Sequence, residues 1–166
     1  MEIMKLSKKY FVRELDKRDI HDIYELCIHN TLYYEYCPPI VTEDSIKADM
    51  VALPPNTEIS NKYYIGFYDD GKLIAIMDLI DGYPKKDIAF IGFFMTEKII
   101  QKQGVGSEII TDICEYLQKI GFTSARLAWV KGNLQAEHFW TKNGFVKIKE
   151  TSSNVADCVI LAERIL

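Results

Sequence analysis

The six residues Gln101-Lys102-Gln103-Gly104-Val105-Gly106 join an apolar strand pattern, Ile88 to Met95, to an amphipathic helix pattern that begins at Val105. Two glycines allow a tight turn and a close backbone approach to a ligand. The first N–H groups of the helix have no acceptor within the helix and lie at the positive end of its dipole. The junction therefore predicts a site for an anion such as a pyrophosphate.

Two common nucleotide-binding motifs do not fit this junction. The dinucleotide fingerprint needs a third glycine three residues after Gly106, where the sequence has Ile109, and the Walker loop needs a Gly-Lys-Ser/Thr triplet that is absent. Taken alone, the two glycines are also compatible with an ordinary strand-to-helix turn that binds nothing. The surrounding sequence has to distinguish a turn from a site.

Strand and helix patterns alternate on both sides of the junction. A hairpin is indicated where two runs of β-branched and aromatic residues flank Asp69-Asp70-Gly71. The expected strands are residues 10–15, 63–68, 73–80, 88–95, 124–130, 145–149 and 158–165. Four helices are expected, one after an Asp16 cap, one from a Thr42 cap to about Leu53, one from Val105 to a stop at Gly121, and one over 133–142.

Gly92 interrupts the strand expected at 88–95. The strand is otherwise almost wholly apolar, so we expect it to be central and covered on both faces. Glycine weakens a strand interior, and its presence indicates a bulge or a close approach by a backbone or ligand. Tight core packing is the alternative explanation.

Composition limits the classes of function. A chain of 166 residues with 48% hydrophobic residues suits one domain, here taken as residues 1–166. The formal net charge is −4 and no Lys/Arg run is present, which argues against nucleic acid or an anionic membrane as a partner. We find no secretory leader, no membrane-spanning segment and no clustered zinc ligands, and we expect a cytoplasmic protein without a metal.

The junction and a second motif together resemble the GNAT superfamily of N-acetyltransferases. The family pattern of Gln or Arg, two residues, Gly, one residue, then Gly or Ala is matched by Gln101, Gly104 and Gly106. A second family element is matched by Asn133, Ala136, an aromatic position at Trp140, and Gly144-Phe145 after the helix. The resemblance covers about residues 63–145 most clearly.

The resemblance implies a mixed α/β fold and acetyl-coenzyme A as acetyl donor. The fold would be a central twisted, mostly antiparallel sheet with a splayed parallel pair, flanked by about four helices. The end of the central strand would bond the pantetheine amides, the glycine turn would wrap the pyrophosphate, and Asn133 would contact the pantetheine arm. The implied cofactor-binding residues are Phe94, Met95, Thr96, Gln101, Lys102, Gln103, Gly104, Val105, Gly106, Ser107, Asn133 and Trp140.

The implied reaction is direct transfer of the acetyl group to a primary amine of a small molecule or peptide. The catalytic residues stay unassigned. Many family members have a Tyr acid where this chain has Trp140, and an indole cannot protonate a leaving thiolate. Glu35, Asp78 and His138 are candidates for proton transfer, with a structural role as the alternative for each.

The segment Tyr33-Tyr34-Glu35-Tyr36 is the candidate acceptor site. An aromatic wall with one carboxylate suits a cationic amine, although these tyrosines would equally cover an edge of the core. Two other classes of function remain open: a module that senses acyl-coenzyme A without turnover, and a structural domain whose glycine turn binds nothing. The sequence does not decide the oligomeric state.

Overall fold

The computed structural model describes residues 1–152 and 158–166. In this part of the chain a seven-stranded sheet has the order β1-β2-β3-β4-β5-β7-β6. The strands are β1 (Phe11–Glu14), β2 (Lys62–Asp69), β3 (Lys72–Asp81), β4 (Ile88–Thr96), β5 (Ser124–Val130), β6 (Val146–Thr151) and β7 (Val159–Ile165). Neighbouring strands are antiparallel except for the parallel pair of β4 and β5, so the predicted mixed sheet is confirmed.

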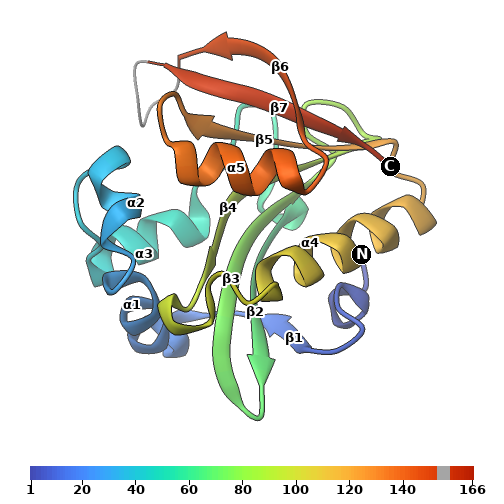
Figure 1. The fold of residues 1–166 in the computed structure, drawn as a ribbon. Coiled ribbons are helices and arrows are strands. Elements are labelled where there is room, and N and C mark those ends of the chain that lie inside the picture. Colours follow the sequence, from blue (N-terminus) through green and yellow to red (C-terminus); the bar gives the residue numbers. More distant parts are fainter. Residues whose placement is uncertain (153–157) are drawn as a thin grey trace.

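Helices cover both faces of the sheet (Figure 1). The described α-helices are α1 (Ile20–Ile28), α2 (Thr31–Tyr36), α3 (Glu43–Val51), α4 (Val105–Lys119) and α5 (Leu134–Lys142). Short 3-10 helices lie at η1 (Ile3–Lys5), η2 (Lys17–Asp19), η3 (Ile59–Asn61) and η4 (Lys98–Ile100). One apolar core packs α4 and α5 against one face, and a second packs α1 and α3 against the other.

Helix α2 was not expected from the sequence, which predicted only a connection there. It is six residues long, and no side chain among the described residues caps either end, so no local signal marks it. The ring of Tyr33 packs edge-on at 5.5 Å from Phe93 of β4. A contact between residues far apart in sequence thus stabilises this helix, and residues 1–152 and 158–166 form five α-helices where about four were expected.

Two local capping predictions are confirmed. Thr42 accepts a hydrogen bond from the backbone N–H of Ser45 at 3.0 Å and begins α3. Asp16 caps the 3-10 turn η2, which leads directly into α1. The end of α3 was predicted too late, since the helix stops at Val51 and Leu53 lies beyond it.

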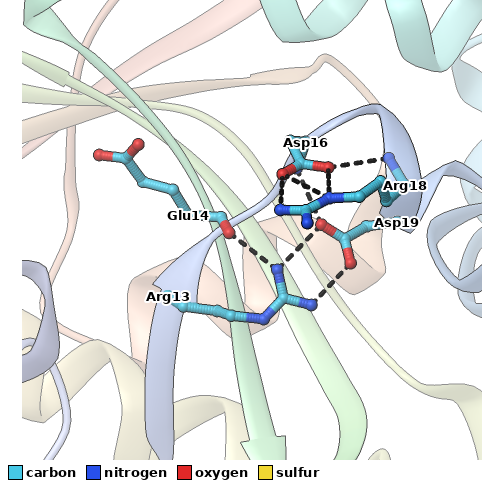
Figure 2. Close-up of polar contacts among 5 residues, drawn as sticks. All are labelled: Arg13, Glu14, Asp16, Arg18 and Asp19. Atoms are coloured by element: carbon cyan, nitrogen blue, oxygen red, sulfur yellow. Dashed lines mark hydrogen bonds and ion pairs between the residues drawn. The ribbon is translucent and has the colours of Figure 1, made fainter.

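A polar cluster fixes the passage from β1 into α1 (Figure 2). The Arg13 guanidinium donates to both carboxylate oxygens of Asp19, at 2.9 and 2.6 Å. Asp19 also accepts from the Asp16 backbone N–H at 2.8 Å, and Asp16 pairs with exposed Arg18. Hydrogen bonds from Arg13 lower the pKa of Asp19 despite its burial. The cluster holds the carboxylate in its ionised form.

Asp19→Asn is therefore expected to lower the free energy of unfolding at neutral pH by about 1–3 kcal/mol, the usual cost of losing a charged hydrogen bond. Because the folded pKa is lowered, the wild-type advantage is complete above about pH 4 and disappears as pH falls through the folded value. Denaturant unfolding at neutral pH measures the loss of stability, and the same experiment near pH 2 shows whether the difference between the two proteins disappears. Asp16→Asn is the control: it keeps a good capping oxygen and removes only an exposed charge, so its effect should be much smaller.

Candidate active site

Strands β4 and β5 separate partway along their length. They pair only from Ile88 with Ser124 to Ile91 with Leu127, and β4 then continues to Thr96 without a partner on that side among the described residues. Figure 1 shows β5, β6 and β7 turned away from the direction of β2 and β3. The backbone of β4 beyond Ile91 is thus an unpaired edge within the sheet.

Gly92 forms the predicted bulge in β4. The register shifts there, with Asp78 of β3 opposite Phe93 and Leu79 opposite Ile91, so Gly92 is the extra residue. The expectation that this strand is covered on both faces is wrong for its second half. Gly92 is exposed and Phe93 is only partly buried, at the point where β5 no longer runs alongside β4.

The splay opens a cleft of about 750 Å³ that passes from one face of the sheet to the other. At one end it is lined by the start of α4 and by α5, including Gly106 and Phe139. At the other end it is lined by Leu32, Tyr33 and Cys37, in and next to α2. A long ligand could therefore lie across the sheet, with one end near α4 and the other near α2.

The turn before α4 has the geometry of an anion site. Gly104 is the N-cap, with a left-handed φ of 91°, and no side chain of the described residues caps the helix. The first helical bond runs from the Glu108 N–H to the Gly104 carbonyl, at 3.0 Å, so the preceding N–H groups in the first turn have no acceptor within the helix. Lys98 and Lys102 also line the cleft and add positive charge.

The Gln101 side chain holds this turn against the rest of the protein. Its amide donates to Asn30 Oδ1 at 2.6 Å and to the Thr96 carbonyl at 3.3 Å. Asn30 is buried, and its own amide donates to the Leu26 and Thr96 carbonyls. Sequence reasoning missed Asn30, because its partner Gln101 is 71 positions away and no local pattern connects them.

Aromatic rings form one wall of the cleft. Trp140 is 9% exposed and packs against Phe94, Phe139 and Phe145, with ring centroids 6.1, 4.9 and 5.3 Å away. A Cβ on Gly106 would lie 3.2 Å from the Phe139 ring, so this glycine lets α4 pack closely against α5. Trp140 therefore belongs both to the core and to the wall of the cleft.

The cleft brings together most of the residues predicted to bind a cofactor. Asn133 lines the cleft and is buried, while its Oδ1 caps α5 by accepting from the Ala136 N–H at 3.0 Å. Gln103 and Val105 do not line it. Those that do are Phe94, Met95, Thr96, Gln101, Lys102, Gly104, Gly106, Ser107, Asn133 and Trp140.

The predicted acceptor residues are only partly brought together. Tyr33 lines the cleft and is partly buried, and desolvation raises the pKa of its hydroxyl. Tyr34, Glu35 and Tyr36 do not line it, and Glu35 is exposed. A role for these three in acceptor binding stays a prediction without a contact to support it.

The catalytic candidates lie in different places. His138 and Trp140 line the cleft, and both come from α5, the helix at the α4 end. Glu35 lies outside the cleft in α2. Asp78 is not a lining residue, but it lies beside the Gly92 bulge and forms an ion pair with Lys62 of β2.

Neither a metal cluster nor a membrane span is found in the described parts of the chain. No group of three or more His, Cys, Asp or Glu side chains there could hold a metal ion. No helix formed by residues 1–152 or 158–166 has the length and apolar character needed to cross a bilayer.

Solved structures share this fold at low sequence identity. An acetyltransferase from Thermus thermophilus is 14% identical with a TM-score of 0.78, over 95% of this chain and 97% of that one. RimL, a ribosomal L7/L12 alpha-N-protein acetyltransferase in complex with coenzyme A, is 12% identical with a TM-score of 0.75, over 99% and 98%. A chimera of the spermidine N-acetyltransferase SpeG from Vibrio cholerae and hSSAT is 16% identical with a TM-score of 0.70, over 95% and 96%.

Sequence comparison gives the family. None of the curated protein sequences matches this chain. Residues 20–145, however, match the profile of the Acetyltransferase (GNAT) family, and this range contains the splayed strands, the turn before α4 and all of α5. The chain therefore belongs to the GNAT acetyltransferase family.

Proposed function

We propose that this chain is an enzyme that transfers an acetyl group from acetyl-coenzyme A directly to a primary amine. The observation that carries the proposal is the continuous cleft between β4 and β5, with unbonded helix N–H groups near one end and a free strand edge along its side. An acetyl thioester supplies an activated acyl group, and the protein has to bind, orient and shield it. Structures of the same fold bind coenzyme A, which supports this donor.

Different parts of the cleft would bind different parts of the cofactor. The backbone of Gly104, Val105 and Gly106 would hold the pyrophosphate, with Lys98 and Lys102 adding positive charge. The free edge of β4 from Phe94 to Thr96 would bond the amides of the pantetheine arm, as an added strand does. The aromatic wall around Trp140 would exclude water from the arm.

The far end of the cleft is the proposed acceptor end. Tyr33 and Phe93 meet there, on the face that α1 and α3 cover. A backbone N–H of β4 near Gly92 would stabilise the developing negative charge on the acetyl oxygen. The acceptor proposed is a small amine or a peptide N-terminus in the cytoplasm, since similar folds include a spermidine acetyltransferase and a ribosomal protein N-terminal acetyltransferase.

Release of free coenzyme A thiol, measured with a panel of amines, tests the proposal. The panel is spermidine, glucosamine and a short peptide with a free N-terminal alanine, each with acetyl-coenzyme A. We expect at least one amine to raise thiol release well above the rate without acceptor, and mass spectrometry to find the acetylated amine. Tight coenzyme A binding with no turnover of any amine would instead favour the sensor module. Absence of coenzyme A binding would contradict both.

A further inference from the structure

Asp78 of β3 lies beside the bulge at the acceptor end of the cleft. It pairs with Phe93 in the sheet register and lies on the same face as Ile76, which packs in the core with α1 and α3. A Cβ built on Gly92 would lie 2.8 Å from Asp78 Oδ2 and 3.3 Å from its Cγ. The carboxylate thus occupies the space that a side chain at Gly92 would take. Gly92 lines the cleft, and because glycine has no side chain, nothing of that residue beyond its backbone separates the carboxylate from the cleft.

Asp78 is half of a buried ion pair whose hydrogen bonding is incomplete. Lys62 Nζ lies 2.7 Å from Asp78 Oδ2, and the two side chains are only 1% and 16% exposed. Neither Nζ nor Asp78 Oδ1 has a well-directed hydrogen-bond partner within residues 1–152 and 158–166. Buried charges are normally satisfied, because leaving one unpaired is costly. Oδ1 is closed off from solvent, so the oxygen that lies toward Gly92 and the cleft is Oδ2, which Lys62 Nζ holds in place.

The charges around Asp78 come from two neighbouring elements. Burial raises the pKa of the Asp78 carboxyl, and the Lys62 ammonium partly offsets this. Asp49 of α3 interacts with both members of the pair, and the Lys62 ammonium lies 5.7 Å from the centre of the Tyr64 ring. Tyr34 and Cys27 are the next titratable groups around the ion pair, and they lie close to Tyr64.

We propose that Asp78 is the catalytic base, which takes the proton of the acceptor amine at Oδ2, and that Lys62 is a positioning residue that orients this carboxylate and favours its ionised form. The inference rests on the proposed acetyl transfer. As the amine nitrogen bonds to the acetyl carbon, the carbon–sulfur bond breaks and coenzyme A leaves as a thiolate. The nitrogen proton passes to Asp78 and then to solvent, and the thiolate takes a proton from solvent.

The other candidates fit this step less well. His138 and Trp140 come from α5, on the α4 side of the sheet, whereas the proposed acceptor end lies near α2 on the opposite face. Glu35 is exposed and outside the cleft. Of the four candidates, Asp78 alone places a carboxylate oxygen, Oδ2, next to a cleft residue at the acceptor end.

The test compares Asp78→Asn, Lys62→Met and the double variant, using the best amine of the panel. Asp78→Asn should lower kcat by about 100-fold or more, as expected for loss of a general base, and leave the Kd of acetyl-coenzyme A within about twofold. It also leaves Lys62 buried without a counter-charge, so its unfolding temperature should fall. The double variant removes that charge and should recover the unfolding temperature without recovering kcat.

The pH profile separates a base from a structural residue. At low pH, wild-type kcat/KM should fall twice as steeply as that of Asp78→Asn, because both the amine and the carboxylate must lose a proton. In Lys62→Met the steep fall of kcat/KM should occur at higher pH, since the Lys62 ammonium, which lowers the pKa of Asp78, is lost. The same upward shift should appear in a ¹³C NMR titration of the Asp78 carboxyl in the ligand-free protein.

Two outcomes would overturn this inference while the proposed function stands. One is an active double variant, which would give Asp78 a structural role only. The other is an Asp78→Asn variant with the wild-type rate and steepness at low pH. A wild-type protein that acetylates no amine overturns the proposed function, and this inference with it.

Discussion

Gly104→Val is expected to weaken acetyl-coenzyme A binding by at least about tenfold while the protein stays folded. Gly104 has a φ of 91°, which a β-branched residue adopts only with strain, and it is the residue from which α4 begins. Relief of that strain would turn the first N–H groups of α4 away from the pyrophosphate. Loss of one charge-assisted hydrogen bond costs about 1.5–3 kcal/mol, which corresponds to roughly tenfold to 100-fold in Kd. Isothermal titration calorimetry measures it.

Gly71→Val is the matched control for backbone strain. Gly71 has a φ of 80°, and an added Cβ at either glycine meets no heavy atom of the described residues within 4 Å. Gly71 lies in the β2–β3 turn and does not line the cleft. Both variants should lose about 1–2 kcal/mol of stability, but only Gly104→Val should lose affinity. Equal affinities in the two variants would show that the turn before α4 does not bind the cofactor.

Local signals explain why much of the fold was predictable. Asp70 and Gly71 both have positive φ, as the turn of a tight hairpin requires, and an Asp-Gly pair is typical of such a turn. Thr42 and Gly121 likewise mark a helix start and a helix end through their own chemistry. Each of these features depends on a few neighbouring residues, so sequence alone was sufficient.

The ion pair at the acceptor end could not be predicted, because it depends on a bulge that no sequence signal marks. The β2–β3 register shifts between Phe67 and Tyr68, and this shift places Tyr64 opposite Asp78. Lys62 is two residues from Tyr64 and so shares its face of the sheet. Without the shift, Asp78 would pair with Tyr63 and point to the other face. The sequence shows that both charged residues are present, but it does not show that they lie close together.

The turn before α4 and the acceptor end of the cleft differ in how well the sequence predicted them, again because one depends on neighbouring residues and the other on distant ones. The glycine turn is contiguous in sequence, and the structure places most of its residues at the cleft. The acceptor end combines β3, β4 and α2, whose contacts are all long-range, such as Tyr33 with Phe93. Of the four residues predicted for acceptor binding, only Tyr33 lines the cleft. The residues of a contiguous motif are therefore far easier to place together from sequence than those of a pocket assembled from distant segments.

Gly92→Ala is expected to lower kcat by roughly 100-fold, a loss typical of misplacing a reacting group by about 1 Å. The new Cβ would lie 2.8 Å from Asp78 Oδ2, which is too close, so the carboxylate has to move. Aspartate has a short side chain, and this movement would separate it from Lys62 Nζ. The Kd of acetyl-coenzyme A should change little, since the turn before α4 is untouched. Steady-state kinetics with the best amine and calorimetry with the cofactor separate the two effects.

Gly66→Ala is the matched control, because it crowds another glycine of the same sheet. Its Cβ would lie 2.7 Å from Leu73 Cδ1 and 2.8 Å from Leu15 Cδ2, so the atoms displaced are apolar. Gly66 belongs to β2 and does not line the cleft. Both alanine variants should lower the unfolding temperature, because each added methyl group forces packed neighbouring atoms to move. Only Gly92→Ala should lower kcat per folded molecule, and a similar loss in Gly66→Ala would mean that general distortion of the sheet, rather than displacement of Asp78, limits the rate.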